Sequence, residues 1–231
     1  MRDKVLSGNA DEEAHRRLRI EELSRMQLAR RLHDGPIQAV AALALRAYLA
    51  RRRLASDPAA ASDDVRELEE LARSTTQDMR YLQFTLSPGS LQASGIDAAL
   101  HDLVHQLDDL YDHKVQITLD PQADNLLSKR QQHQIFHIAV EALDNTRKHA
   151  QAGSVHLKLH SPEQNVLILE VEDDGIGFDP LISGEAADEE GKFGLAILRE
   201  RVKLLHGELH IRSAAGSGTL LRVALPLSAG K

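Results

Sequence analysis

Hydrophobic residues between positions 11 and 54 recur at intervals of three and four, among glutamates and arginines. They are Leu18, Leu23, Met26, Leu32, Val40, Leu43, Ala47 and Leu54. This period places them along one face of an α-helix. The predicted helix is too long for an ordinary small globular domain, and it is typical of a coiled coil or a dimeric bundle.

A second helix is predicted after a short interruption. Residues 56–58 (Ser-Asp-Pro) end the first period, an alanine-rich turn follows, and residues 62–64 (Ser-Asp-Asp) predict the N-cap of a helix that runs to about residue 86. Together the helices predict an antiparallel hairpin. One hairpin leaves its apolar stripe exposed, whereas two hairpins bury it in a four-helix bundle, so we predict a homodimer.

The hydrophobic period changes after residues 87–90 (Ser-Pro-Gly-Ser), which we interpret as a domain boundary. The expected domains are a coil with a dimerisation hairpin over 1–87 and a second domain over 95–228. Within the second domain the pattern predicts helices at 96–111, 128–150 and 193–206, and strands at 115–119, 155–160, 166–171, 208–213 and 219–225. The expected fold class is α+β: a helical hairpin followed by an α/β sandwich whose sheet is covered on one face.

Composition narrows the function classes. The chain has 42% hydrophobic and 27% charged residues but only 3% aromatic residues and no Trp, so its core is expected to be aliphatic. A net charge of -7 argues against direct nucleic-acid binding. The absence of Cys excludes disulfides and thiolate metal sites. No apolar run is long enough to predict a membrane segment in this chain.

Pro36 interrupts the first helix at a group of reactive side chains. It has no N–H for the carbonyl of Leu32, and its ring crowds that turn, at a cost of roughly 3 kcal/mol in a helix interior. His33 and Asp34 lie directly before it, and Gln38 follows one turn after Asp34 on nearly the same face. An imidazole beside a carboxylate at such a defect predicts acid–base chemistry on His33.

A second group of polar residues lies on the predicted helix at 128–150. Glu141, Asn145 and His149 are four residues apart and form one stripe, with Lys148 alongside. Oxygen ligands and cationic groups in this pattern suit Mg²⁺ and phosphates. A solvated helix face would also explain the stripe on its own. His133 and His137 have the spacing of a zinc protease, but Gln134 stands where the general-base Glu is needed, so we set that interpretation aside.

Glycine-rich turns follow in order along the chain. Residues 173–178 (Asp-Asp-Gly-Ile-Gly-Phe) come directly off a strand, where a carboxylate can accept from an exocyclic amine such as that of adenine. Residues 191–195 place glycines at a predicted helix start, which favours anions. Residues 216–219 (Gly-Ser-Gly-Thr) precede the last strand. Each also fits an ordinary turn, but each independently suits a nucleotide phosphate or base.

In this order the motifs resemble those of the GHKL (Bergerat-fold) ATPase domain, over roughly residues 96–227. With residues 33–38 (His-Asp-Gly-Pro-Ile-Gln) placed upstream on a helical hairpin, the chain resembles the kinase core of two-component sensor histidine kinases. Its His-Asp-x-x-x-Gln signature resembles that of the subfamily of nitrate sensors and the lipid-fluidity thermosensor. The resemblance implies ATP and Mg²⁺ as cofactors.

The resemblance also implies roles for the polar stripe. Asn145 would be the protein ligand of Mg²⁺. Glu141 would polarise a water on the metal or approach the metal itself. Lys148 and His149 would lie near the phosphates.

The glycine-rich turns receive roles from the same resemblance. Asp173 would bind the adenine amine, in a loop that Gly175 and Gly177 shape. Residues 181–192 would form a mobile lid. Gly194 and Leu195 would lie where the N-terminus of a helix meets the phosphates. Gly218 and Thr219 would close the adenine side of the site. Orthodox kinases have one residue between the lid-end glycines, whereas Gly191 and Gly194 are separated by two.

The implied function is autophosphorylation of His33 by ATP, followed by transfer to an aspartate on the receiver domain of a response regulator. Nε2 of neutral His33 would attack the γ-phosphoryl group, with Asp34 as hydrogen-bond partner or general base. Gln38 would orient water in a phosphatase reaction. The alternative is a dimeric scaffold that binds ATP without phosphorylating itself. The implied location is cytoplasmic, either free or as part of a membrane-bound sensor, with sensory input from an upstream segment or a partner.

Overall fold

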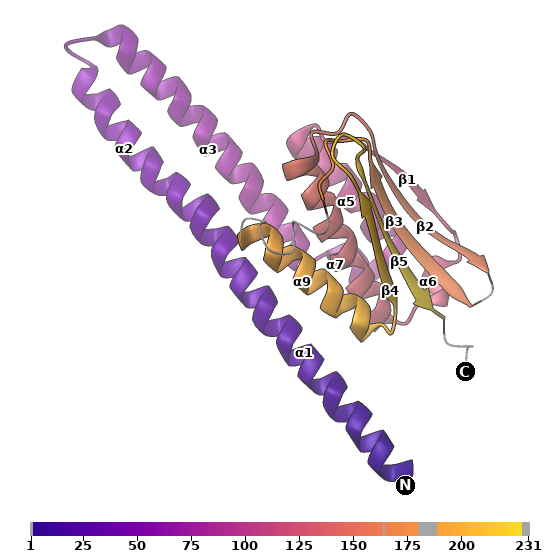
Figure 1. Cartoon of the computed structure of the whole chain (residues 1–231). Coiled ribbons are helices and arrows are strands. Elements are labelled where there is room, and N and C mark those ends of the chain that lie inside the picture. Colours follow the sequence, from indigo (N-terminus) through magenta and orange to yellow (C-terminus); the bar gives the residue numbers. More distant parts are fainter. Residues whose placement is uncertain (1, 164, 180–188, 228–231) are drawn as a thin grey trace. The chain divides into compact units, whose positions relative to one another are not determined.

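Figure 1 shows a computed structural model of the chain, which describes residues 2–163, 165–179 and 189–227. Contacts divide the chain into two compact units, one formed by Arg25–Ser87 and the other by Met1–Ser24 with Pro88–Lys231. Among the described residues, no helix is long and apolar enough to cross a membrane.

The first long helix forms as expected, but it changes type at Pro36. Helix α1 (Arg2–Leu32) leads into a π-helical turn, η1 (His33–Ile37), and then into α2 (Gln38–Arg53). Leu32 and Gln38, on either side of η1, both keep right-handed helical backbone angles. The wider turn absorbs the missing N–H of Pro36 without ending the helix, and π-turns of this kind are frequent at functional sites.

Helix α3 (Pro58–Leu86) starts earlier than the sequence predicted. Asp57 is its N-cap: the carboxylate accepts a hydrogen bond from the Ala60 N–H at 3.1 Å, and Pro58 is the first helical residue. The predicted cap at 62–64 is therefore wrong, because the alanine-rich segment forms the first turn of the helix rather than a turn before it. Proline suits this first position because its missing N–H would have no helical partner there.

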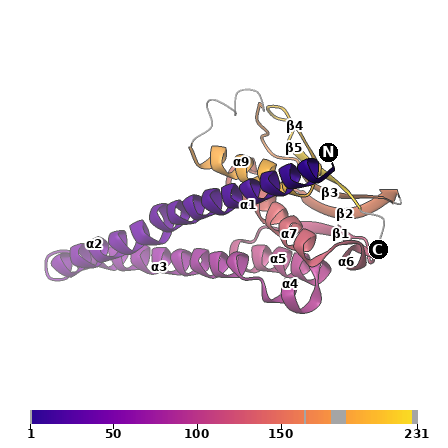
Figure 2. The same ribbon diagram turned by 90° about the horizontal axis from the view of Figure 1, so that it is seen from below.

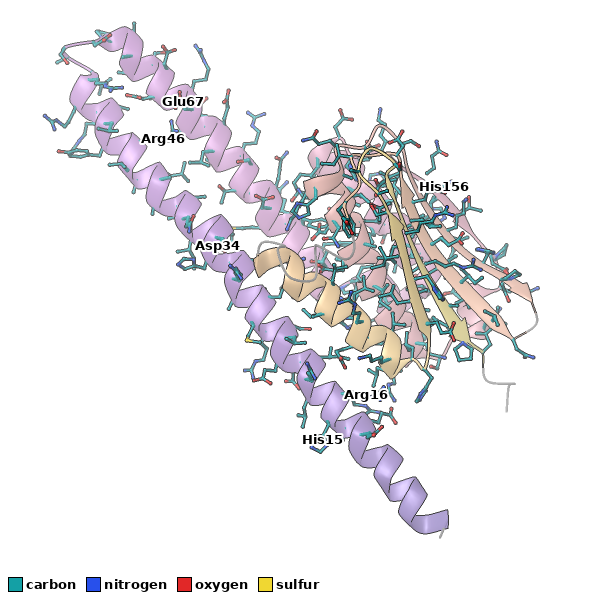
Figure 3. All side chains as sticks on the ribbon, in the orientation of Figure 1. His15, Arg16, Asp34, Arg46, Glu67 and His156 are labelled. Atoms are coloured by element: carbon teal, nitrogen blue, oxygen red, sulfur yellow. The ribbon has the colours of Figure 1, made fainter. Side chains whose placement is uncertain are left out.

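Helices α2 and α3 pack as an antiparallel hairpin (Figure 1). Arg46 on α2 forms an ion pair with Glu67 on α3, and the two side chains face one another in Figure 3. Nearer the hairpin loop, Arg53 holds both carboxylate oxygens of Asp64 at 2.9 and 3.0 Å. Large apolar side chains of the hairpin stay exposed, and they are Ile37, Val40, Leu45, Tyr48, Leu49, Leu54, Val65, Met79 and Leu86.

The second unit contains a sheet and helices in the order that follows. The elements are α4 (Gly89–Ser94), α5 (Ile96–Tyr111), β1 (Val115–Leu119), α6 (Ala123–Leu126), α7 (Lys129–Asn145), η2 (Thr146–Ala150), β2 (Val155–Glu163), β3 (Val166–Asp173), α9 (Glu189–Leu204), β4 (Glu208–Ser213) and β5 (Thr219–Pro226). The short helices α4 and α6 were not expected, and α9 begins four residues before its predicted start at 193.

The five-stranded sheet has the order β1-β2-β3-β5-β4. Only β1 and β2 pair in parallel, and the other neighbours are antiparallel. Helices α5, α7 and α9 lie on one face, as both views show (Figures 1 and 2). The α/β sandwich with one covered face is therefore confirmed.

The core between the helices and the sheet is mainly aliphatic, as composition indicated, with Phe136 as its largest residue. Strand β2 shows the alternation that produces this layer. Val155, Leu157 and Leu159 are buried, whereas the residues between them face outward. His156, for example, lies on the outer face (Figure 3), where its Nε2 is 3.0 Å from the hydroxyl of Thr118 on β1.

The cap of α3 gives a stability prediction. Asp57→Ala removes the acceptor of the Ala60 N–H, so we expect the hairpin to lose about 1 kcal/mol of unfolding free energy. Urea unfolding of the full chain, followed by helical circular dichroism, measures this loss. Ser62→Ala is the matched control, because Ser62 lies inside the helix, where loss of its hydroxyl changes little. A larger effect at Ser62 than at Asp57 would contradict the assigned cap.

Candidate functional site

Helix α7 carries the predicted polar stripe. Its start is fixed by a capping box, in which the Gln131 N–H donates to the Ser128 hydroxyl at 3.3 Å and the Ser128 N–H donates to Gln131 Oε1 at 2.9 Å. The helix ends at Asn145 and widens into the π-turn η2, which carries Lys148 and His149. The stripe is thus built on a rigid, capped element that packs against β3.

Two residues of the π-turn η2 that do not belong to the polar stripe, Thr146 and Arg147, contact neighbouring residues. The Arg147 guanidinium lies 4.1 Å from the centre of the Tyr111 ring, and one of its nitrogens is 3.6 Å from buried Asp144. The Thr146 hydroxyl is 3.1 Å from Nε2 of His113, and burial lowers the pKa of that histidine. These contacts link the π-turn to α5, to the segment before β1 and to the end of α7.

A cavity of about 390 Å³ opens beside α7 and the sheet. Residues predicted for nucleotide binding contribute to its wall, and they are Asn145, His149, Asp173, Gly177, Leu195 and Thr219. Much of the remaining wall is apolar and was not predicted, with contributions from Val171, Ile176, Phe178, Ile211 and Leu221. An apolar cavity with a few polar groups suits a flat aromatic ligand that carries hydrogen-bonding edges.

Asp173 is the carboxylate in this cavity. It ends β3 and is only 7% exposed, and burial raises its pKa above the usual value. Hydrogen bonds from the backbone N–H groups of Gly175 and Thr219 oppose that rise, and the first is 2.9 Å long. A buried acceptor with few protein donors is well suited to take a hydrogen bond from an amine of a ligand.

The loop after β3, with Gly175, and the turn before β5, with Gly218, approach each other closely next to Asp173. A Cβ on Gly175 would lie 2.1 Å from the carbonyl oxygen of Ala150, and a Cβ on Gly218 would lie 2.0 Å from the carbonyl oxygen of Asp173. The Gly218 N–H also donates to the Gly175 carbonyl at 2.9 Å. Gly177 has a positive φ of 59° and an equally close neighbour in the Ala214 carbonyl. These positions therefore require glycine for close backbone approach.

Ser213 is a residue of the site that sequence reasoning missed. Its hydroxyl accepts from the Phe178 N–H at 2.8 Å, donates to the Gly218 carbonyl at 2.9 Å, and lies 3.0 Å from the Thr219 hydroxyl. It thereby joins the loop after β3 to the turn before β5. The only sequence signal was its place at the end of a strand, because its contacts depend on the pairing of Ser213 with Thr219.

Other predicted residues lie outside the cavity wall. Glu141 is 9% exposed and packs against α9, where a Cβ on Gly194 would lie 2.1 Å from its Oε1. Because α9 begins at Glu189, Gly194 and Leu195 lie in the second turn of this helix and not at its N-terminus, which corrects the expected placement. Lys148 is exposed on η2 and does not line the cavity.

The predicted lid at 181–192 lies mostly outside the described residues, which resume at 189. Its last residues belong to the start of α9, Gly191 among them. The two glycines with the two-residue spacing, Gly191 and Gly194, therefore both lie within α9.

His133 and His137 touch on α7, with ring centres 4.5 Å apart. Burial lowers the pKa of His137 to about 3, with smaller contributions from Arg201 and His133. Arg201 donates to Gln134 Oε1 at 2.7 Å, and a nearby cation disfavours metal binding by the rings. Within the described part of the chain, no group of three or more His, Cys, Asp or Glu residues is arranged to hold a metal ion.

The hairpin unit carries a separate group of predicted residues, on the π-turn η1. His33 Nδ1 lies 2.8 Å from Asp34 Oδ1, and the two side chains are 68% and 49% exposed. The hydrogen bond to His33 is the main cause that lowers the pKa of Asp34, so this carboxylate is ionised and accepts the hydrogen bond. Gln38 is exposed at the start of α2.

With Nδ1–H donated to Asp34, the lone pair of the ring is on Nε2. The exposed imidazole can therefore act as a nucleophile through Nε2, while Asp34 holds the proton on the other nitrogen. An accessible imidazole in a fixed tautomer suits the transfer of a group onto histidine.

Family models match both groups of residues, each within its own unit. A family described as histidine kinase matches residues 24–91, and a family described as histidine kinase-, DNA gyrase B-, and HSP90-like ATPase matches residues 130–229. The chain belongs to the histidine kinases. The first match contains His33, Asp34 and Gln38, and the second contains the cavity with Asn145 and Asp173.

Individual relatives agree with this assignment. The chain is 29% identical over 216 residues to the signal transduction histidine-protein kinase/phosphatase DegS of Brevibacillus brevis. The alignment covers 91% of this chain and 53% of that relative. The chain is 29% identical over 209 residues to the nitrate/nitrite sensor protein NarQ of Escherichia coli, with 90% and 35% covered. The expected likeness to nitrate sensors is therefore confirmed.

A solved structure shows the same fold. The histidine kinase domain of the blue-light activated histidine kinase from Erythrobacter litoralis EL346 superposes with a TM-score of 0.51, at 18% identity, over 81% of this chain and 96% of that domain. This histidine kinase chain spans between about a third and about half the length of the curated relatives it matches.

The glycine crossing gives a binding prediction. Gly175→Ala places a methyl group against the Ala150 carbonyl, so the loop that holds Asp173 must shift. We expect ATP affinity to fall at least tenfold, by the loss of about 1.4 kcal/mol or more. Isothermal titration with ATP and Mg²⁺ measures the affinity.

Gly153→Ala is the matched control. Its added Cβ would meet only the Asp174 carboxylate, at an ordinary 3.6 Å, so affinity is expected to stay near wild type. Equal losses at both positions, or none at Gly175, would contradict the assigned role of the crossing.

Proposed function

We propose that this chain is the kinase part of a sensor histidine kinase that transfers the γ-phosphoryl group of ATP to His33 and then to an aspartate of a response regulator. The observation that carries the proposal is the 2.8 Å contact between His33 Nδ1 and Asp34, which leaves Nε2 as the nucleophilic nitrogen. The nucleotide cavity in the second unit supports it.

The cavity residues fit ATP. The carboxylate of Asp173 is buried and faces an apolar wall, which suits an adenine ring with its exocyclic amine at Asp173. Asn145 and His149 line the same cavity from α7 and η2, so the phosphates would extend toward them. Lys148, exposed on η2, adds positive charge for the phosphates.

The donor set also fits Mg²⁺. This ion prefers a small number of protein oxygens, with water and phosphate oxygens completing its shell. The amide oxygen of Asn145 would be the protein ligand, and Glu141 would act on a water of the metal. Mg²⁺, when bound, supplies charge neutralisation for the phosphoryl group that is transferred.

In the transfer step, the Nε2 lone pair of His33 attacks the γ-phosphorus in line, and the bond from phosphorus to the β,γ-bridging oxygen breaks. ADP leaves with the electron pair of that bond. The imidazolium that forms loses its Nδ1 proton toward Asp34, whose carboxylate is already in place. The product is a phosphoramidate on Nε2.

We infer that the working form is a homodimer. The apolar side chains that the hairpin leaves exposed lie along α2 and α3, where a second hairpin would cover them. A receiver domain of a response regulator is the proposed acceptor of the phosphoryl group. A cytoplasmic location would follow from these partners.

The alternative function is a scaffold that binds ATP without phosphorylating itself. Such a protein would need the cavity but not the Asp34 contact to His33. The presence of His33, Asp34, Glu141 and Asn145 together favours the kinase.

The kinase proposal predicts a phosphohistidine. Incubation with γ-labelled ATP and Mg²⁺ should label the wild-type chain with a phosphate that is stable to alkali and labile to acid. His33→Gln and Asn145→Ala should each lose the label, the first because the nucleophile is absent and the second because the nucleotide is not productively held. Circular dichroism of both variants controls for folding.

Tight ATP binding by the wild type without any label would contradict the kinase proposal and would favour the scaffold. Label that survives His33→Gln would place the acceptor elsewhere in the chain.

A phosphatase reaction is the second activity proposed, and it rests on Gln38. This side chain is exposed near His33, and its amide could orient water toward a phosphorylated aspartate on a docked receiver domain. The relative DegS carries the name kinase/phosphatase.

Gln38→Ala should slow dephosphorylation of a phosphorylated receiver domain at least tenfold while leaving autophosphorylation of His33 within about twofold of wild type, because an oriented water assists only the first reaction. The rate of dephosphorylation is measured as release of phosphate from a purified phosphorylated receiver domain, alone and after addition of the wild-type chain or the Gln38→Ala variant. An equal loss of both reactions would contradict the assigned role.

A further inference from the structure

The carboxylate of Asp34 has two partners on the π-turn and the helix before it. Its Oδ1 is 2.8 Å from His33 Nδ1, and its Oδ2 is 3.5 Å from Nε of Arg30. Arg30 lies four residues before Asp34, on the last turn of α1, so it reaches the carboxylate from the N-terminal side. All of these residues belong to one unit of the chain.

We propose that Arg30 is a positioning residue for the phosphoryl transfer: it holds Asp34 with one oxygen directed at His33 Nδ1, and so keeps the proton on Nδ1 and the nucleophilic lone pair on Nε2. The inference rests on the proposed kinase function and deepens it.

The geometry explains why one contact would be insufficient. A carboxylate on an exposed helix turn rotates about its terminal torsion, and a single hydrogen bond fixes that rotation poorly. A second partner on the other oxygen fixes the plane of the carboxylate. Nucleophile, base and a third group that orients the base form the arrangement seen in activated nucleophiles generally, and here these are His33, Asp34 and Arg30.

The value of Arg30 lies in orientation and not in stability. Both members of the Arg30–Asp34 pair are partly exposed, at 33% and 49% of their side-chain surface. Exposed ion pairs contribute little to folding, about 0 to 1 kcal/mol. A structural role would therefore be small. The guanidinium also helps to lower the pKa of Asp34, after the larger effect of the hydrogen bond to His33.

Without this arrangement the ring would change its tautomer. An imidazole side chain free in water favours the proton on Nε2, which leaves the lone pair on Nδ1, the nitrogen nearer the backbone. A carboxylate held at Nδ1 reverses that preference. Loss of Arg30 should therefore move part of the His33 population into the unreactive tautomer.

The test combines spectroscopy with kinetics on the full chain. ¹⁵N chemical shifts of the His33 ring report which nitrogen carries the proton, in the absence of ATP. In the wild type we expect the Nδ1–H tautomer to predominate. In Arg30→Gln we expect a measurable shift toward Nε2–H, together with an autophosphorylation kcat about three- to tenfold lower and an unchanged KM for ATP. Arg30→Lys should recover most of both signals, because an ammonium at this position can also pair with Asp34.

Arg46→Gln is the matched control. It removes an ion pair of the same hairpin, with Glu67, but far along α2 from His33. It should leave the tautomer and kcat at their wild-type values. Circular dichroism shows whether either Gln variant alters the helices. Asp34→Ala, which has no side-chain acceptor, serves as the reference for complete loss of the acceptor at Nδ1.

The outcomes separate this inference from the kinase proposal. A wild-type tautomer and kcat in Arg30→Gln would overturn the positioning role while leaving the kinase intact. A lower kcat with an unchanged tautomer would overturn it as well. A tautomer shift in a chain whose wild type takes no label would show that Arg30 sets the tautomer of His33, but it would overturn the kinase function and with it the role of Arg30 in phosphoryl transfer.

Discussion

The hydrogen bond between Asp34 and Nδ1 of His33 is the interaction on which the proposed chemistry depends. Its geometry comes from the backbone. Pro36 cannot donate to the turn before it, and the helix responds with the π-turn η1, in which Asp34 and the adjacent imidazole lie on an exposed bulge. The turn that accommodates the proline therefore also carries the reactive pair.

The cavity proposed to bind ATP depends on a different constraint, the close approach of backbone segments. The loop after β3 and the turn before β5 cross where Gly175 and Gly218 leave no room for a Cβ, and Ser213 ties both segments together. This crossing holds the carboxylate of Asp173 in a largely apolar wall, where it accepts from the backbone N–H groups of Gly175 and Thr219. An aromatic ligand with an amine at its edge is the complement of that wall. The second π-turn, η2, brings His149 to the same cavity.

Periodicity and motif order were sufficient to predict the hairpin, the sheet strands and the candidate nucleotide residues. They failed where neighbouring signals compete. The Asp57-Pro58 pair is equally consistent with the end of the first helix and with the start of the next one, where Asp57 is the N-cap and Pro58 lies in the first turn. The structure shows the start of α3. Helix α9 starts before its glycines, which places Gly194 in a turn where Glu141 needs the space. Ser213, Ile211 and Phe178 enter the site only through strand pairing and loop folding, which no local pattern records.

The most direct test of the central claim is to determine which nitrogen of His33 carries the phosphate. The chain, phosphorylated with ATP and labelled with ¹⁵N in histidine, would be examined by ³¹P and ¹⁵N magnetic resonance under alkaline conditions. Because Asp34 occupies Nδ1, the account predicts phosphorus bonded to Nε2 alone. Phosphorus on Nδ1 would contradict it, since the nitrogen that holds the carboxylate would then be the nucleophile.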